Sequence, residues 1–206
     1  MKKFKIFVDL ESEEAWLNLM AMEGYSFNFK GIYYHFSENS TAVNELIKID
    51  YRKFKNQRDF LDYVAMFEDS GWQHISGTKS SGKQYFKCAD SKKNTEIFSD
   101  NYSIAGKFKR VSDMWLTCAT LLFAWFIILS GQGKIHLQEL FQPKDWYLTP
   151  GLWHLNGTDF IWAFLFETPF ALIRGGLGLF FVGTFILSII LSAKYLNTYK
   201  KLRTMD

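Results

Sequence analysis

The pattern of apolar and polar positions divides the chain into two unlike halves. Residues 1–110 alternate short apolar stretches with charged positions, and they hold 17 of the 24 Lys/Arg and 15 of the 21 Asp/Glu residues. Residues 111–206 instead contain two long uncharged runs. This segmentation predicts a water-soluble domain over residues 1–106, followed by a membrane module over residues 107–206.

Short periodic segments in the first half predict a small α+β domain. Apolar residues at helical spacing predict helices over 11–23 and 57–69, each followed closely by a glycine. In the first helix Trp16, Leu19 and Met20 are expected on the apolar side, and Glu11, Glu13 and Glu14 are expected to complement the helix dipole. Period-two alternation predicts strands over 4–8, 25–29, 32–36, 45–51, 72–76 and 83–88. Residues 25–36 fit either one bent strand or a hairpin.

The first half also contains an internal sequence repeat. Each predicted helix follows a strand and leads into a glycine and an aromatic residue, Gly24-Tyr25 in one case and Gly71-Trp72 in the other. Two such halves around one antiparallel sheet would form a ferredoxin-like (βαββαβ) cytoplasmic domain with an added strand. The predicted fold is therefore this α+β domain followed by a two-helix transmembrane hairpin.

The second half contains two segments long enough to cross a bilayer. The first span is expected at about 111–130, and the second at about 169–195, with Thr168-Pro169 as its helix start. Seven Lys/Arg residues flank the spans on the side of the two termini, against three in the intervening loop. The positive-inside rule therefore predicts that both termini are cytoplasmic, with a basic tail over 196–206.

The loop over 131–168 is rich in aromatic residues, which favour the membrane–water boundary. Its segment 158–167 is too short to span and is interpreted as an interfacial or re-entrant helix. The expected membrane-interface anchors are Trp146, Trp153, Trp162, Arg174 and Lys194. Thr184, Ser188 and Ser192 recur every fourth residue, which allows close helix packing either within the hairpin or between subunits.

Several classes of function find little support in the sequence. A net charge of +3, without basic clusters interleaved with aromatics, argues against direct nucleic-acid binding. His136, His154 and Glu139 share the outer loop, but their spacing is not typical of a metal site. The chain has no nucleotide-binding or hydrolase motif. We therefore predict no catalytic residues, no metal and no cofactor, and expect that the protein is not an enzyme.

Aromatic residues are unusually frequent in the predicted strands. They either fill both faces of the sheet, because β-structure favours them, or leave an uncovered face that binds a partner. The residues considered for such an interaction surface are Tyr33, Tyr34, Phe36, Trp72, Tyr85 and Phe86.

A set of aromatic and glycine motifs in the first 110 residues resembles a known bacterial family. The motifs are Gly24-Tyr25, Gly31–Phe36, Ile49-Asp50-Tyr51, Ser70-Gly71-Trp72, Gln84-Tyr85-Phe86 and Ile97–Ser103. The family is the domain of unknown function DUF2812. The resemblance implies C-terminal membrane spans and genes neighbouring PadR-like transcriptional repressors or transport systems. It supplies no catalytic residues.

The architecture and the resemblance together lead to one functional expectation and one alternative. We expect a regulatory or accessory protein of the bacterial plasma membrane that acts with a PadR-like repressor or a transport system through its cytoplasmic domain. The alternative is a small subunit of a transporter or channel assembly that forms a homo-oligomer. Its partners in either case include the lipid bilayer.

Overall fold

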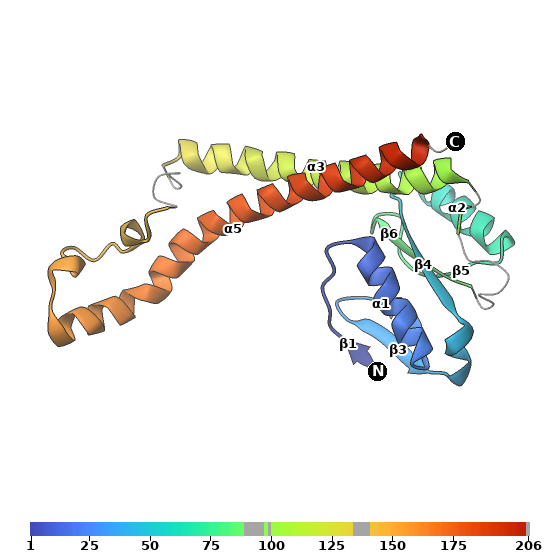
Figure 1. Cartoon of the computed structure of the whole chain (residues 1–206), viewed down its shortest axis with the longest axis horizontal. Coiled ribbons are helices and arrows are strands. Elements are labelled where there is room, and N and C mark those ends of the chain that lie inside the picture. The colour runs from blue at the N-terminus through green and yellow to red at the C-terminus, as the bar shows by residue number, and fades with distance from the viewer. Residues whose placement is uncertain (89–96, 99, 134–140, 205–206) are drawn as a thin grey trace. The chain divides into compact units, whose positions relative to one another are not determined.

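The computed structural model describes residues 1–88, 97–98, 100–133 and 141–204 (Figure 1). These residues form two compact units, one made of residues 1–110 and 199–206, and the other of residues 111–198. His136 and Glu139, considered above for a metal site, lie outside the described residues.

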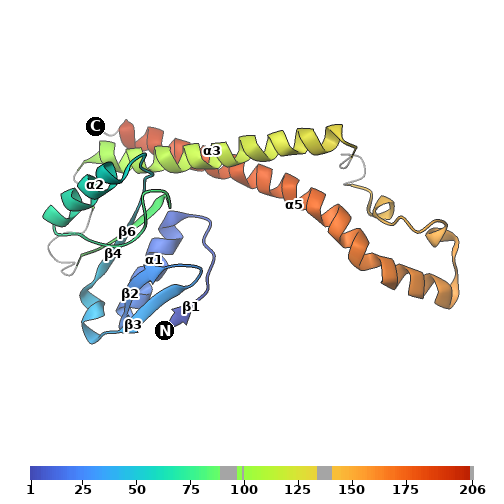
Figure 2. The same cartoon turned by 180° about the vertical axis from the view of Figure 1, so that it is seen from behind.

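The first unit consists of two β-α-β-β motifs in succession (Figure 2). The first comprises β1 (Lys2–Lys3), α1 (Leu10–Met22), β2 (Tyr25–Lys30) and β3 (Tyr34–Glu38). A short 3-10 helix, η1 (Ser40–Asn44), leads to the second, which comprises β4 (Leu46–Tyr51), α2 (Gln57–Asp69), β5 (Gln73–Ser76) and β6 (Lys83–Cys88). Each motif forms a three-stranded antiparallel sheet, with the orders β1-β3-β2 and β4-β6-β5.

The two motifs repeat each other in detail. Helices α1 and α2 are both 13 residues long. The glycines that follow them, Gly24 and Gly71, both have φ +86°, a left-handed conformation in which glycine is least strained. Their backbone N–H groups donate to the carbonyls of Ala21 and Glu68, each at 2.9 Å. The internal repeat in the sequence therefore corresponds to a repeated motif in the fold.

The hydrogen-bonded ladders of the described strands do not join into the single sheet of a ferredoxin-like domain. Side chains of α1 cover the free edge of β4. The Asn18 amide accepts a hydrogen bond from the N–H of Ile47 at 2.7 Å and donates to the Ile47 carbonyl at 3.0 Å. The Glu14 carboxylate accepts from the N–H of Ile49 at 3.0 Å. The helix thus satisfies backbone groups that a neighbouring strand would otherwise pair.

The strand predicted over residues 4–8 is wrong. Only Lys2 and Lys3 pair with β3, because β3 begins at Tyr34 and offers no partner further along. The apolar alternation is nevertheless present, and Phe4 and Ile6 are 62% and 77% exposed. Residues 25–38 form a hairpin of β2 and β3, which resolves the choice left open by the sequence.

The buried side of α1 also differs from the prediction. Leu19 is exposed, and the buried residues of the helix are Leu10, Glu13, Leu17, Met20 and Ala21. The helix is turned so that Glu13 faces inward, where oppositely charged and hydroxyl groups surround its carboxylate. The prediction missed this because glutamate is usually a surface residue and was therefore assigned to the polar side of the helix.

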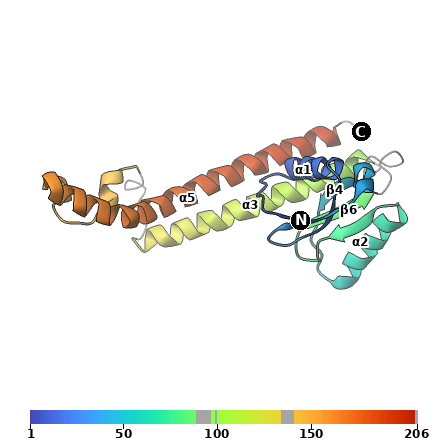
Figure 3. The same cartoon turned by 90° about the horizontal axis from the view of Figure 1, so that it is seen from below.

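The second unit contains two long apolar helices that lie side by side (Figure 3). Helix α3 (Asn101–Gly131) begins in the first unit and continues into the second, and α5 (Gly157–Arg203) has 47 residues. Both are long and apolar enough to cross a membrane. In the most apolar 18-residue window of each, only 6% of α3 and 22% of α5 is buried, unlike the core helix of a soluble protein.

Ser112 and Ser192 join the two long helices through reciprocal hydrogen bonds. The Ser112 hydroxyl donates to the carbonyl of Ser192 at 2.9 Å, and the Ser192 hydroxyl donates to the carbonyl of Ser112 at 3.1 Å. Ser188 is also buried, at 2% exposure. Ser188 and Ser192 of the small-residue stripe therefore serve packing within the hairpin, which was one of the two interpretations above.

The second long helix starts earlier than predicted. It begins at Gly157 and includes Pro169, so residues 158–167 are its first turns and not a separate interfacial or re-entrant helix. Proline removes one backbone donor, and the helix continues when nearby groups compensate. The hydroxyl of Thr168 donates to the carbonyl of Phe164 at 2.6 Å, one residue before the Leu165 carbonyl that Pro169 cannot pair.

The described part of the loop before α5, with the 3-10 helices η2 (Pro143–Trp146) and η3 (Leu152–His154), is fixed to that helix. The Glu167 carboxylate accepts hydrogen bonds from the backbone N–H groups of Leu148 and Thr149. Arg174 donates to the carbonyl of Trp146. The indole ring of Trp146 lies where a Cβ atom on Gly175 would be, so only glycine fits at this position.

We expect Gly175→Leu to displace Trp146 and release the loop. The change should expose the indole ring to solvent, shift its fluorescence to longer wavelength and increase proteolytic cleavage near residues 143–155. The contribution of Trp146 is obtained by subtracting the spectrum of Trp146→Phe. Gly176→Leu is the matched control, because nothing lies within 4 Å of a Cβ atom there. Equal effects of the two leucine variants would contradict the proposed packing.

Candidate functional site

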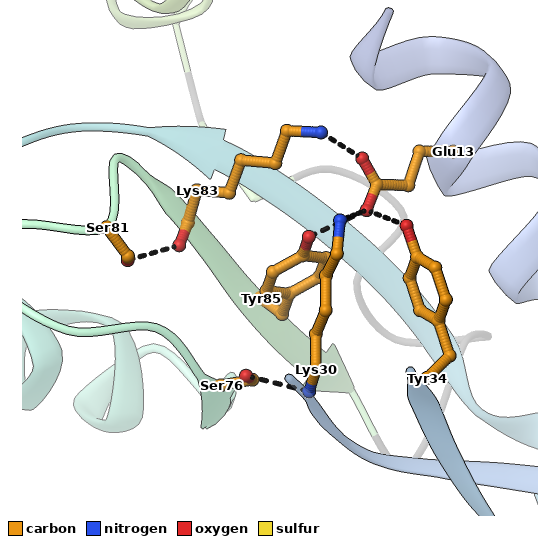
Figure 4. A network of polar contacts seen from close by, with 7 residues as sticks. All are labelled: Glu13, Lys30, Tyr34, Ser76, Ser81, Lys83 and Tyr85. Atoms are coloured by element: carbon orange, nitrogen blue, oxygen red, sulfur yellow. Dashed lines mark hydrogen bonds and ion pairs between the residues drawn. The ribbon is translucent and has the colours of Figure 1, made fainter. Parts of the chain in front are cut away.

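The most extensive buried polar cluster of the first unit surrounds Glu13 (Figure 4). The side chain is fully buried. Its Oε1 atom accepts hydrogen bonds from the hydroxyls of Tyr34 and Tyr85, both at 2.6 Å, and from the ammonium of Lys30 at 3.0 Å. Its Oε2 atom accepts from the ammonium of Lys83. Helix α1 thus contacts β2 and β3 of its own motif and β6 of the other.

Charges and hydrogen bonds keep Glu13 ionised. Burial alone would raise the pKa of its carboxyl, but the Lys83 ammonium and the hydrogen bonds from Lys83, Tyr34 and Tyr85 together hold the pKa below its usual value. For both tyrosines, burial and the adjacent carboxylate raise the pKa of the phenol well above its usual range. At neutral pH the cluster therefore contains one carboxylate and two neutral phenols.

This protonation state suits a structural junction and not general acid–base chemistry. A base that works near neutral pH needs a pKa near 7, and a nucleophilic tyrosine needs a lowered pKa. Glu13 and its two tyrosines are shifted in the opposite directions. Lys30 and Lys83 remain about one quarter exposed, whereas the tyrosines are buried. The cluster ties the two β-α-β-β motifs together.

A second buried cluster ties the beginning of α3 to β4. The Asp50 side chain is 1% exposed. It accepts a hydrogen bond from the hydroxyl of Tyr63 at 2.7 Å and one from the guanidinium of Arg110 at 2.9 Å. Arg110 also donates through Nε to the carbonyl of Tyr51 at 2.6 Å. Burial, followed by the charge of Asp50, raises the pKa of Tyr63 well above its usual range.

The first turns of α3 form part of the first unit's core. Ala105 and Phe108 are buried, and Lys107 lies 3.8 Å from the carboxylate of Glu14 on α1. Glu14 also pairs with Lys48 of β4 at 3.1 Å. One continuous helix thus combines a segment held by ion pairs with a long apolar segment.

The proposed aromatic interaction surface is not an exposed sheet face. Tyr33 is 48% exposed, but the other five residues are at most 3% exposed. Phe36 packs against Phe27 and Trp16, and Phe86 belongs to a core with Phe67. The five buried residues are Tyr34, Phe36, Trp72, Tyr85 and Phe86. Of the two interpretations left open by the sequence, these five residues therefore fit the one in which aromatic side chains fill the covered faces of the sheets.

Of the residues predicted as membrane anchors, four lie in the loop before α5 or in the first part of that helix, and Lys194 lies near its C-terminal end. Trp162 and Trp153 are 73% and 43% exposed, and Trp146 is half-buried against Gly175. Arg174 and Lys194 are exposed and 20 positions apart on α5. At about 1.5 Å per residue this separation is about 30 Å, the thickness of the hydrocarbon core of a bilayer.

Within the described residues, no three His, Cys, Asp or Glu side chains are grouped so that they could hold a metal ion. The sequence did not predict the roles of Glu13, Lys30 and Lys83. One signal of the burial of Glu13 was available in the sequence. Glu13, Leu17 and Met20 are spaced by four and three residues, so they lie on the same face of α1.

The fold and these clusters define an α+β domain, built from a repeated motif, that carries two helices able to cross a membrane. The chain belongs to the family described as "Protein of unknown function (DUF2812)", whose model matches residues 9–120. The match extends through the domain into α3. No curated protein and no solved structure matches the chain.

Proposed function

We propose that this chain is a non-enzymatic regulatory or accessory protein of a bacterial plasma membrane. Its α+β domain lies in the cytoplasm and binds a protein partner, either a PadR-like repressor or a subunit of a transport system. Helices α3 and α5 anchor the protein in the bilayer. The excess of Lys and Arg beside the spans supports the cytoplasmic location of both termini.

The observation that carries this proposal is the dual character of α3. Its residues 101–110 belong to the folded domain, held by Arg110 on Asp50 and by Lys107 on Glu14. The same helix continues without interruption through an apolar segment. A continuous helix of this kind is one way to connect a membrane segment to a regulatory domain.

The chemistry of the buried clusters supports a non-enzymatic role. Glu13, Asp50 and Glu14 are each engaged by cations and by hydrogen-bond donors. The tyrosines beside Glu13 and Asp50 have raised pKa values, so they are neutral at physiological pH.

The exposed apolar residues near the N-terminus offer a surface for the protein partner. Phe4 contacts Tyr33 edge-on, with 5.9 Å between ring centroids. Ile6 and Ile32 are 77% and 79% exposed. Clusters of exposed apolar side chains on a folded domain often mark interaction sites.

The test is purification of the full chain from cross-linked bacterial membranes, followed by identification of bound proteins. We expect a transcriptional regulator or a transporter subunit with the wild type, and loss of it in Ile6→Ser/Ile32→Ser. Leu61→Ser is the control, because Leu61 is 55% exposed on α2. Recovery of neither kind of partner would contradict the proposal.

The alternative of an oligomeric transporter or channel subunit has less support. It relied on the small-residue stripe of α5, and Ser188 and Ser192 are occupied within the hairpin. Native mass measurement in detergent distinguishes the two: a defined homo-oligomer with a polar path through the bilayer would favour the alternative.

A further inference from the structure

A cleft lined by both polar and apolar side chains lies beside the first turns of α3, separate from the Glu13 cluster. Its volume is about 460 Å³, within the range of about 300–1,000 Å³ typical of small-ligand sites. It lies between α2 and the N-terminal part of α3. The polar and small residues that line it include Arg52, Tyr63, Ser70, Ser103, Gly106 and Arg110.

Arg52 contributes a positive charge to this cleft that no carboxylate neutralises among the described residues. Its side chain is exposed, and its guanidinium lies over the rings of Phe54 and Tyr63, 5.4 and 5.5 Å from their centroids. Aromatic rings hold the guanidinium by cation–π attraction without using its N–H groups. Within the part of the chain that the structure describes, none of its five N–H donors has a hydrogen-bond partner, so they are available for a ligand.

Arg110 adds a further donor group to the lining of the cleft. Its Nε and Nη2 atoms donate to the Tyr51 carbonyl and to Asp50, whereas Nη1 has no partner in the described part of the chain. Nη1 lies above Gly106, where a Cβ atom would approach it to 3.2 Å. Glycine at position 106 thus leaves this end of the guanidinium uncovered.

Ion pairing distinguishes the two arginines of the cleft. Arg110 pairs with the buried carboxylate of Asp50 at 2.9 Å, whereas Arg52 has no ion pair among the described residues. Asp100 also lines the cleft, but its carboxylate caps α3 by accepting from the N–H of Ser103 at 2.7 Å. The hydroxyl of Ser70 donates to the carbonyl of Met66. Among the described residues, the donors that remain free in the cleft are therefore those of the Arg52 guanidinium and the Nη1 group of Arg110.

We propose that this cleft binds a phosphate group through Arg52 and Arg110. The fork of Arg52 and the Nη1 group of Arg110 together match the several oxygens of a phosphate, whereas the Arg52 fork alone already satisfies both oxygens of a carboxylate. Arg110 directly precedes the apolar part of α3, and Met114 lies about 6 Å further along the helix axis at 1.5 Å per residue. Both an anionic lipid headgroup and a soluble phosphate ester share the required chemistry.

The test uses the full chain in neutral detergent at low salt and two probes, glycerol phosphate and dioctanoyl phosphatidic acid, titrated by calorimetry. We expect saturable binding of at least one probe. Arg52→Gln should weaken it at least about tenfold, because charge-assisted hydrogen bonds are lost. Arg52→Lys, which keeps the charge but not the fork, should have an intermediate effect. Asp100→Asn, which can still cap the helix, should strengthen binding about two- to fivefold by removing a negative charge.

Arg58→Gln is the matched control, because Arg58 lies on the exposed surface of α2 and pairs only loosely with Asp62. Equal affinity for both probes identifies a soluble phosphate ester as the ligand, and binding of phosphatidic acid alone identifies a lipid headgroup. Absence of binding by either probe, or equal loss in Arg52→Gln and Arg58→Gln, would overturn the proposal. The test requires no protein partner, so it is independent of the function proposed above.

Discussion

Replacement of Glu13 by alanine is expected to lower the free energy of unfolding of the first unit by about 3 kcal/mol. The change removes the acceptor of Tyr34 and Tyr85, whose hydroxyls are buried and have no access to water. It also leaves the ammonium groups of Lys30 and Lys83 without their counter-ion. Both lysines are partly exposed and can turn toward solvent, which limits the loss.

The measurement is thermal unfolding of the full chain in detergent, with hydrogen exchange used to locate the change. For a domain of this size the expected loss corresponds to a fall in Tm of roughly 10 °C or more. Exchange should increase in β2, β3 and β6 together, because the cluster connects both motifs. Glu11→Ala, an exposed change in the same first turn, should cost at most about 1 kcal/mol. Similar losses of stability in Glu13→Ala and Glu11→Ala would contradict the proposal that Glu13 holds the two β-α-β-β motifs together.

The stability contribution of Glu13 should depend on pH. Its carboxyl has a lowered pKa in the folded state, so the contribution is complete above the unfolded value near 4.5. It is lost as pH falls below that value through the folded pKa. Glu13→Gln lacks this titration, so the difference in Tm between wild type and variant should narrow below about pH 4.5. A constant difference down to pH 3 would contradict the assignment.

Replacement of Asp50 by alanine should cost about 2 kcal/mol and loosen the beginning of α3. The change leaves the buried hydroxyl of Tyr63 without its acceptor and Arg110 without its ion pair. Amides over residues 104–110 should exchange faster, whereas those deep in the apolar segment of α3 should not. A double-mutant cycle with Arg110→Ala should show coupling of about 1–3 kcal/mol.

The control for Asp50 is the ion pair of Arg58 and Asp62, which are 90% and 73% exposed and 4.0 Å apart. Asp62→Ala should change stability by at most about 0.5 kcal/mol, because solvent screens an exposed pair. Additive effects of the Asp50 and Arg110 changes would show that Arg110 does not hold α3 through Asp50.

Much of the fold could be predicted from local patterns. Helix α2 has the predicted bounds, α1 is displaced by one residue at each end, and β6 agrees over its full length. The strand at residues 4–8 was wrong because alternation reports propensity only, and a strand also needs a partner with free backbone groups. The predicted start of α5 was wrong because proline at a helix start is only a statistical preference, and this helix continues through Pro169.

The candidate sites were much harder to predict. The aromatic residues proposed as a surface proved to be core, because the helices that cover them come from elsewhere in the sequence. Arg52 and Arg110 are 58 positions apart and share one cleft only after folding. The sequence around an arginine does not show whether its guanidinium N–H groups will be used in hydrogen bonds within the folded protein.

The sequence by itself determined the division into a charged domain and an apolar module, the two helices able to cross a membrane, and the internal repeat with its paired glycines. These features depend on residues that are close together along the chain, where hydropathy, helix period and backbone conformation act directly. Only the tertiary structure decided that Glu13 is buried. Its charge is tolerated there because Lys30 and Lys83, 17 and 70 positions away, are brought to it by the fold.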